Sequence, residues 1–126
     1  MILLAGIPTE PPVELAKDSA DAAGIECIVL NQRSFAFDDI EMRFVDGKCA
    51  GEIRVGMQSH PLGSFTGIYT RMTDAESLPE LAPKRNGAPD PSALNRARAW
   101  SETMNAWLEL APQRVANRTS ATLSNF

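Results

Sequence analysis

Residues 1–30 read MILLAGIPTEPPVELAKDSADAAGIECIVL and contain the pattern that decides the fold. The unbroken apolar run at residues 1–5 is typical of a strand buried on both faces of a parallel sheet, and residues 25–30 repeat it. Between these runs, small apolar residues recur at helical spacing from Val13 to Ala23. A strand, a crossover helix and a parallel strand within about 30 residues form one β-α-β unit, which predicts an α/β fold with a Rossmann-like layout.

Turn-forming residues mark both ends of this predicted helix. Thr9 offers a capping hydroxyl, and Pro11 and Pro12 suit a first helical turn. Gly24 follows the last apolar position, where glycine commonly ends a helix. We therefore expect a helix that is capped by Thr9 and ends at Gly24.

The next segment changes to the two-residue period of half-exposed strands. Residues 39–44 and 49–55 alternate apolar side chains with mostly charged ones, and Asp46 and Gly47 between them suit a tight hairpin turn. A third short strand at residues 58–62 would complete an antiparallel meander. We expect this meander at one edge of the main sheet.

The second half of the chain predicts a return to the main sheet and one long helix. Residues 67–72 read GIYTRM, as a returning strand would, and residues 73–90 are polar and proline-rich, which predicts a surface loop with one short turn. Pro91 opens the clearest helix of the chain, and Pro112 stops it. Residues 114–117 predict one more short strand.

The long helix carries a stripe of large apolar side chains. Trp100, Met104 and Trp107 recur at steps of four and three residues. Such a stripe usually packs into a core, so we expect it to lie on the sheet. A subunit interface is the alternative.

Composition predicts one domain and disfavours several classes of protein. The chain has 126 residues, of which 44% are hydrophobic and 22% charged, as in ordinary globular domains. Its net charge of −4 disfavours broad nucleic-acid binding, which usually needs a basic face. The longest apolar stretch, Met1 to Ile7, is too short to cross a bilayer, and no basic segment precedes it as in a secretory signal. We therefore expect a cytoplasmic protein that binds neither nucleic acid nor membrane.

The sequence lacks the common catalytic and metal-binding patterns. The turn from Gly6 to Thr9 has no spaced glycines of a dinucleotide fingerprint, and no glycine-rich phosphate loop with its lysine occurs. His60 is the only histidine, which disfavours a His-rich metal site. Cys27 and Cys49 lie in apolar strands, where we expect small buried hydrophobes rather than a disulfide or a nucleophile. We predict no catalytic residue and no metal ligand in this chain.

Polar side chains follow the predicted strands at the edge where parallel α/β sheets bind ligands. The candidates for ligand binding or for facing a cleft are Thr70, Arg71, Asn117, Arg118, Asn31 and Arg33. Three of them are arginines, whose planar guanidinium pairs bidentately with carboxylate or phosphate oxygens. The alternative is that these strands simply end in polar loops.

Several segments, taken in order, carry a resemblance to a known family. They are Ile2-Leu3-Leu4 before Gly6-Ile7-Pro8, Leu30-Asn31-Gln32-Arg33, the Asp46-Gly47 hairpin, Gly67-Ile68-Tyr69-Thr70-Arg71, and Val115-Ala116-Asn117-Arg118 before Ser124-Asn125. Together they resemble the N-terminal, or pre-ATP-grasp, domain of ATP-grasp ligases, in particular the ribosomal-protein glutamate ligases and the microviridin-type peptide ligases. The resemblance implies a three-layer, Rossmann-like domain with a mostly parallel central sheet and an antiparallel β-meander at one edge.

The resemblance also implies a function. Ligases of this kind use ATP and Mg²⁺ to activate a carboxylate as an acyl phosphate, which an amine or a similar nucleophile then attacks. Residues 1–126 would be a single domain, with residues 119–126 as the start of a linker into an absent ATP-grasp domain in cis. We expect an accessory domain that is not catalytic in isolation and binds no cofactor itself, but shapes the cleft and contributes to substrate placement or to a homodimer.

Two alternatives stay open at this point. The chain could be a self-sufficient module that binds a small anionic ligand through the arginines that follow its strands. It could instead be an oligomerisation domain, whose tryptophan helix or meander edge pairs with a second copy.

Overall fold

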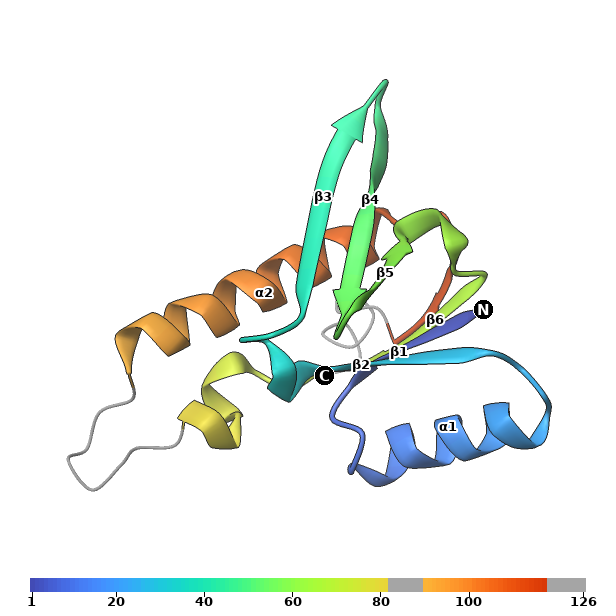
Figure 1. The fold of residues 1–126 in the computed structure, drawn as a ribbon, viewed down its shortest axis with the longest axis horizontal. Helices are drawn as coiled ribbons and strands as arrows, with labels where there is room; N and C mark the ends of the chain where they lie inside the picture. Colours follow the sequence, from blue (N-terminus) through green and yellow to red (C-terminus); the bar gives the residue numbers. More distant parts are fainter. Residues whose placement is uncertain (82–89, 118–126) are drawn as a thin grey trace.

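Two β-sheets and two α-helices make up the computed structural model, which describes residues 1–81 and 90–117 (Figure 1). In chain order the elements are β1 (Ile2–Gly6), α1 (Pro11–Ala22), β2 (Cys27–Asn31), η1 (Gln32–Ser34), β3 (Asp39–Val45), β4 (Lys48–Val55), β5 (Gln58–Pro61), η2 (Leu62–Ser64), β6 (Gly67–Arg71), η3 (Ala75–Ser77), η4 (Pro79–Leu81), α2 (Pro91–Leu110) and β7 (Arg114–Ala116), where η marks a short 3₁₀ helix. Strands β2, β1, β6 and β7 form a parallel sheet in that order, and β3, β4 and β5 form an antiparallel one. The predicted α/β class with a parallel sheet and a meander is confirmed, although the meander forms a separate sheet.

The β-α-β unit forms as predicted, with a difference at each end of its helix. Glu10 is the N-cap of α1 and makes no side-chain capping bond, so the expectation of a Thr9 cap is wrong. Proline stands at the first helical position, and the residue directly before it therefore becomes the cap. At the other end Gly24 adopts a φ of +70°, and the Ile25 N–H donates to the Ala20 carbonyl at 2.9 Å. Since this bond closes the helix, β2 begins only after Ile25.

Both faces of the parallel sheet are covered, as the apolar run of β1 requires. Leu3, Leu4 and Ala5 are 0%, 3% and 0% exposed, although neighbouring strand residues point to opposite faces. Figure 1 shows α1 on one side of the sheet and α2 with the meander on the other. Leu3 and Ala5 belong to the main core together with α2, which leaves Leu4 to the side of α1. The expected three layers are therefore helix, sheet and helix.

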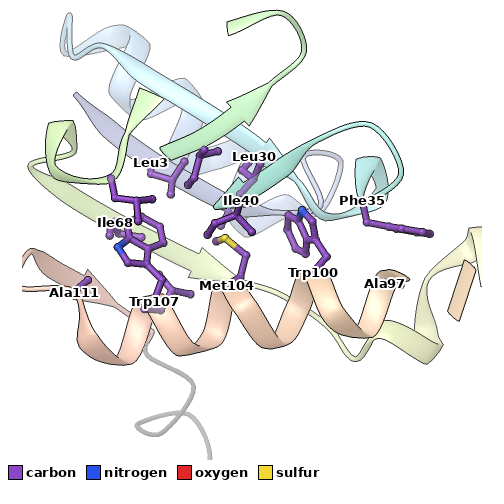
Figure 2. Packing of buried hydrophobic residues seen from close by; sticks show 14 of the residues in the cluster. Leu3, Leu30, Phe35, Ile40, Ile68, Ala97, Trp100, Met104, Trp107 and Ala111 are labelled. Atoms are coloured by element: carbon purple, nitrogen blue, oxygen red, sulfur yellow. The ribbon is translucent and has the colours of Figure 1, made fainter. Parts of the chain in front are cut away.

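Helix α2 supplies the large side chains of the main core. Its N-terminus is capped by Asp90, whose Oδ1 accepts from the Ser92 N–H at 3.1 Å. Figure 2 shows Trp100, Met104 and Trp107 directed from α2 toward the sheets, and all three are buried. The predicted core stripe is confirmed, and the alternative that this stripe forms a subunit interface is not supported.

The segment before α2 differs from the predicted surface loop. Short helices η3 and η4 replace the single turn that we expected, and Ala75, Leu78 and Leu81 are buried. These apolar residues are three apart, a spacing that successive 3₁₀ turns bring to one side. They pack into the core, so this part of the segment is a structural layer. Residues 82–89 of the predicted loop lie outside the described ranges.

The meander is anchored at its base and open at its tip. Ile40 and Ile53 face each other across β3 and β4, and both are buried in the main core. The predicted turn is confirmed, because Asp46 and Gly47 adopt φ values of +52° and +75°. The far half of the β3–β4 hairpin projects away from the rest of the molecule (Figure 1).

Met104→Ala should lower the free energy of unfolding by about 2–5 kcal/mol, because it removes a fully buried side chain from the core. Leu110→Ala on the same helix removes a side chain that is 54% exposed, and should change that free energy by less than about 0.5 kcal/mol. Urea denaturation followed by circular dichroism measures both values. Equal and small losses would contradict the packing of α2 described above.

Candidate functional site

The carboxyl ends of β2, β1 and β6 meet in one row at an edge of the parallel sheet. Gly6, the last residue of β1, is in register with Asn31 on one side and with Arg71 on the other. Because neighbouring strands lie about 4.8 Å apart, the backbones of Asn31 and Arg71 are roughly 10 Å apart. The chain adds β2 on one side of β1 and later adds β6 and β7 on the other. Such a switch point is where open α/β sheets bind their ligands.

Gly6 keeps the middle of this row free of a side chain. A Cβ atom at this position would lie 2.7 Å from the Arg71 carbonyl oxygen and 3.3 Å from Cγ2 of Val13. The first distance is too short for any side chain, so the close approach of β1 and β6 requires glycine. The surface between Asn31 and Arg71 is therefore formed by the backbone of Gly6, and we call it the backbone floor of the row.

Gln32 ties the strand ends on either side of β1 together. It follows β2 directly, and its side chain is fully buried. Its Nε2 donates to the Thr73 carbonyl at 2.7 Å, and its Oε1 accepts from the Thr73 N–H at 2.9 Å. The side-chain amide thus pairs with Thr73 much as a peptide group pairs across a sheet. The loops that follow β2 and β6 are held at a fixed separation, and we call this pair the Gln32 clasp.

Two of the predicted site residues on the β2 side have partners within the chain. The Oδ1 of Asn31 accepts from the Arg33 N–H at 3.0 Å and caps η1. The Arg33 Nε lies 2.7 Å from Oε1 of Glu80 in η4, and both side chains are partly exposed. The guanidinium of Arg33 therefore already has a carboxylate partner. This ion pair helps to hold η4 beside the carboxyl ends of the strands, which we call the rim.

The predicted residues on the β6 and β7 side differ in exposure. Thr70 is 3% exposed and pairs in register with Ala5, on the face that α2 covers. Arg71 is exposed, and no carboxylate among the described residues is within ion-pair distance of it. Asn117 is exposed just beyond β7 at a φ of +65°, and Arg118 lies outside the described residues. The convergence of three arginines stays a prediction, with Arg71 as its exposed, unpaired member in the described chain.

Away from this row of strand ends, a hollow of about 450 Å³ lies between the start of β3 and α2. We call it the β3–α2 hollow, and its lining includes Phe35, Ile40, Arg54, Arg96, Trp100 and Thr103. The Nε1 of Trp100 is buried and has no hydrogen-bond partner in the described structure. Sequence reasoning missed this hollow, although Arg96 and Thr103 flank Trp100 at helical spacing and mark a polar rim beside the apolar stripe.

The two cysteines and the histidine are further candidates for chemistry among the described residues. Burial raises the pKa of the Cys27 and Cys49 thiols, which disfavours the reactive thiolate. Both cysteines are free, and the His60 ring stands 6.3 Å from that of Phe65. Within residues 1–81 and 90–117, no three His, Cys, Asp or Glu side chains come together as a metal site. Over the same ranges, neither helix is long and apolar enough to cross a membrane.

Comparison with solved structures identifies ligases that share this fold. The macrocyclase MdnC from Microcystis aeruginosa MRC, solved with the precursor peptide MdnA, matches with a TM-score of 0.69 and 13% identity, over 94% of this chain and 38% of that one. The macrocyclase MdnB from the same organism matches with a TM-score of 0.64 and 14% identity, over 94% and 38%. A Chryseobacterium gregarium RiPP-associated ATP-grasp ligase, solved with ADP and with a leader and core peptide, matches with a TM-score of 0.64 and 17% identity, over 93% and 34%.

These identities establish likeness of fold. At that level the predicted resemblance to ATP-grasp peptide ligases is confirmed, and the chain spans 34–39% of the length of the ligases it matches. The sequence matches no protein-family model and no curated protein.

Gln32→Glu tests the donating half of the Gln32 clasp. At neutral pH the variant places a carboxylate against the Thr73 carbonyl, and we expect the free energy of unfolding to fall by about 2–4 kcal/mol. Burial should raise the pKa of the new carboxyl above its unfolded value of about 4.3. The protonated carboxyl can donate again, so the loss of unfolding free energy should be smallest below about pH 4.3. This loss, which we call the deficit, should grow as pH rises through the folded-state pKa of the carboxyl.

Urea denaturation at several pH values measures this deficit against the unaltered chain. Arg33→Gln is the matched control, because it breaks a partly exposed ion pair at the adjacent position and should cost no more than about 1 kcal/mol at any of these pH values. A small, pH-independent deficit in Gln32→Glu would contradict the clasp.

Proposed function

We propose that this chain is the N-terminal accessory domain of an ATP-grasp-type carboxylate–amine ligase that acts on a peptide. One observation carries the proposal: the likeness covers 93–98% of this chain but 34–39% of the ligase chains. A fold that accounts for nearly all of this chain and for a minor part of several peptide ligases is expected to serve as one module of such an enzyme.

The substrate and cofactor of the proposed ligase follow by analogy. The Chryseobacterium gregarium ligase was solved with ADP and two peptide segments, and MdnC with a precursor peptide. When bound, ATP with Mg²⁺ would supply the phosphoryl group that activates a peptide carboxylate. Residues 1–81 and 90–117 contain no ready ligand set for a metal ion. We therefore assign nucleotide and metal binding to an ATP-grasp domain in cis.

The part played by this chain would be to form one wall of the cleft. Asn31, Gly6 and Arg71 lie in one row at the carboxyl edge of the sheet, with a backbone floor between the two side chains. The Arg71 guanidinium can pair bidentately with a carboxylate of the peptide. The Gln32 clasp would hold the two sides of the row at a fixed distance, so that substrate binding needs little rearrangement. In this role Arg71 binds substrate and Gln32 is a positioning residue.

The same exposed arginine supports a second candidate function. Arg71 has no carboxylate partner among the described residues, as a site for a small phosphate or carboxylate would require. A self-sufficient anion-binding module would need no further domain. Binding measurements on the isolated chain separate the two functions.

Calorimetric titration of the purified 126-residue chain with Mg-ATP should give no binding heat, because the proposal places the nucleotide site in another domain. Thermal-shift measurements with inorganic phosphate and dicarboxylates should likewise leave the melting temperature unchanged. The coding sequence beyond residue 126 should continue into an ATP-grasp domain, and the longer protein should bind Mg-ATP. Micromolar binding of Mg-ATP by the short chain would contradict the accessory role. Micromolar binding of phosphate or dicarboxylates alone would favour the anion-binding module.

Arg71→Ala in the longer ligase should raise the KM for the peptide substrate by about 10-fold or more, because it removes a charged partner of a carboxylate. Arg71→Lys should recover only part of the loss, since lysine lacks the bidentate fork. Arg114→Ala is the matched control: this exposed arginine begins β7, at the opposite edge of the sheet. An equal change in KM for the Arg71 and Arg114 variants would contradict the assigned cleft wall.

A further inference from the structure

The β3–α2 hollow has the size and the apolar base of a site for a small molecule. Its volume of about 450 Å³ lies within the range of about 300–1,000 Å³ that is usual for ligand pockets. Phe35, Ile40 and Trp100 line it and are 6%, 9% and 6% exposed. Figure 2 shows the Trp100 indole between Ile40 and Phe35. An apolar group that entered the hollow would therefore lie against three core side chains.

Charged residues of both signs line the same hollow. Asp38 and Asp39 are acidic, and Arg54 and Arg96 are basic. A phosphate or a dicarboxylate would be attracted by the two arginines and repelled by the two aspartates. The balanced set is complementary to a ligand that carries one charge of each sign.

Three of these four charges have no partner among the described residues. The Oδ1 of Asp38 accepts from the Gly56 N–H at 3.2 Å and so holds the turn between β4 and β5. Asp39, Arg54 and Arg96 form no ion pair with a described residue. Asp39 and Arg54 are directly opposite each other on β3 and β4, where opposite charges commonly pair. Both charges are thus available to a ligand.

One side of α2 forms the other wall of the hollow. Arg96, Ala99, Trp100 and Thr103 line it and recur at steps of three and four residues. The small side chain of Ala99 leaves room between its larger neighbours. The buried Nε1 of Trp100 has no partner in the described structure, although buried polar atoms usually have one. The wall thus combines space with unpaired hydrogen-bond donors.

We propose that the β3–α2 hollow binds a free α-amino acid with a large apolar side chain. That side chain would lie on the apolar base, where its burial is favourable. The carboxylate would accept from Arg54 and Arg96, whose planar guanidinium groups match two oxygens, and the ammonium would pair with Asp39. An amino acid carries both charges on one carbon atom. This spacing suits Asp39 and Arg54, because the Cα atoms of opposite residues lie about 4.5–5.5 Å apart.

An exposed aromatic ring beside the hollow fits the same ligand. Phe37 lines the hollow and is 84% exposed. Its ring would lose contact with water if it closed over a bound apolar side chain. The inference does not depend on the proposed ligase function, because Asn31, Gly6 and Arg71 of the rim do not line the hollow.

Nuclear magnetic resonance of the 126-residue chain, titrated with L-phenylalanine, tests the site. The chain has two tryptophans, of which Trp100 lines the hollow and Trp107 does not. The indole N–H signal of Trp100 should shift saturably, with a Kd on the order of 0.1–1 mM for so small a ligand, while that of Trp107 stays in place. Glycine should bind about 10-fold more weakly or worse, because it has no side chain to bury.

Matched variants assign the two charges. Arg96→Met should raise the Kd for L-phenylalanine by about 5-fold or more. Arg98→Met is its control on the same helix, because Arg98 pairs with Glu76 at 2.7 Å and does not line the hollow. Asp39→Asn should weaken binding to a similar extent, whereas Glu41→Gln on the same strand should not. All four substituted positions are exposed, and circular dichroism should report unchanged folding.

Ligand analogues separate the two contacts. L-Phenylalaninamide lacks the carboxylate, so Arg96→Met should weaken its binding no further. N-Acetyl-L-phenylalanine lacks the ammonium, so Asp39→Asn should leave its Kd unchanged. Both analogues should bind the unaltered chain more weakly than L-phenylalanine does.

Several results would overturn the inference. One is the absence of a saturable Trp100 shift at about 10 mM L-phenylalanine. Another is an equal effect of Arg96→Met and Arg98→Met. A third is unchanged binding in Ala99→Trp, which fills the hollow from an exposed position. Tighter binding of the N-acetyl analogue than of L-phenylalanine would instead indicate a site for an anion or a peptide.

Discussion

Strand β1 lies between β2 and β6 with both of its faces buried, and most of the fold serves to cover it. A strand of this kind needs an apolar layer on each side, because its side chains alternate between the faces. The side of Leu4 is closed by α1, which contributes the small buried residues Val13 and Ala20. The side of Leu3 is closed by α2 with its two tryptophans and by the base of the meander. The long helix and the second sheet are therefore parts of one layer.

The same strand arrangement sets the position of the candidate site. Parallel strands all end at the same edge, so the polar residues that follow β2 and β6 are brought to the two sides of Gly6. A fully buried amide such as that of Gln32 is costly unless its polar atoms are paired, and Thr73 pairs both the oxygen and the nitrogen. The clasp thus stabilises the fold and fixes the geometry of the rim at once. Arg71 is left exposed beside a rigid backbone floor, which is a suitable arrangement for binding an anion.

Sequence periodicity predicted the elements well because it reports local structure and burial directly. The β-α-β unit, the Asp46-Gly47 hairpin and the apolar stripe of α2 each follow from spacing within one segment. Features that depend on distant segments could not be read in this way. The burial of Leu78, the pairing of Gln32 with Thr73 and the β3–α2 hollow all need the tertiary arrangement. The sequence placed Thr70 and Arg71 among the candidates for ligand binding, but spacing alone could not distinguish exposed Arg71 from buried Thr70 beside it.

In β3 the alternation of apolar and charged residues continues beyond the part of the strand that the core covers. Ile40 is buried, Met42 is partly buried and Phe44 is exposed, although all three lie on the same face. The covering layer ends while the apolar alternation continues, so the core does not account for Phe44. Proteins commonly protect an open edge with charged side chains, proline or a bulge, and β3 carries three charged residues, Asp39, Glu41 and Arg43.

The carboxyl ends of the parallel strands and the β3–α2 hollow are joined by a short segment. Helix η1 begins with the Gln32 clasp and is capped by Asn31, and Phe35 follows it directly into the β3–α2 hollow. The segment that holds one side of the candidate cleft therefore also forms part of the wall of this hollow. Because Gln32 is fully buried and hydrogen-bonded to Thr73, this segment has little freedom to move independently of the rim.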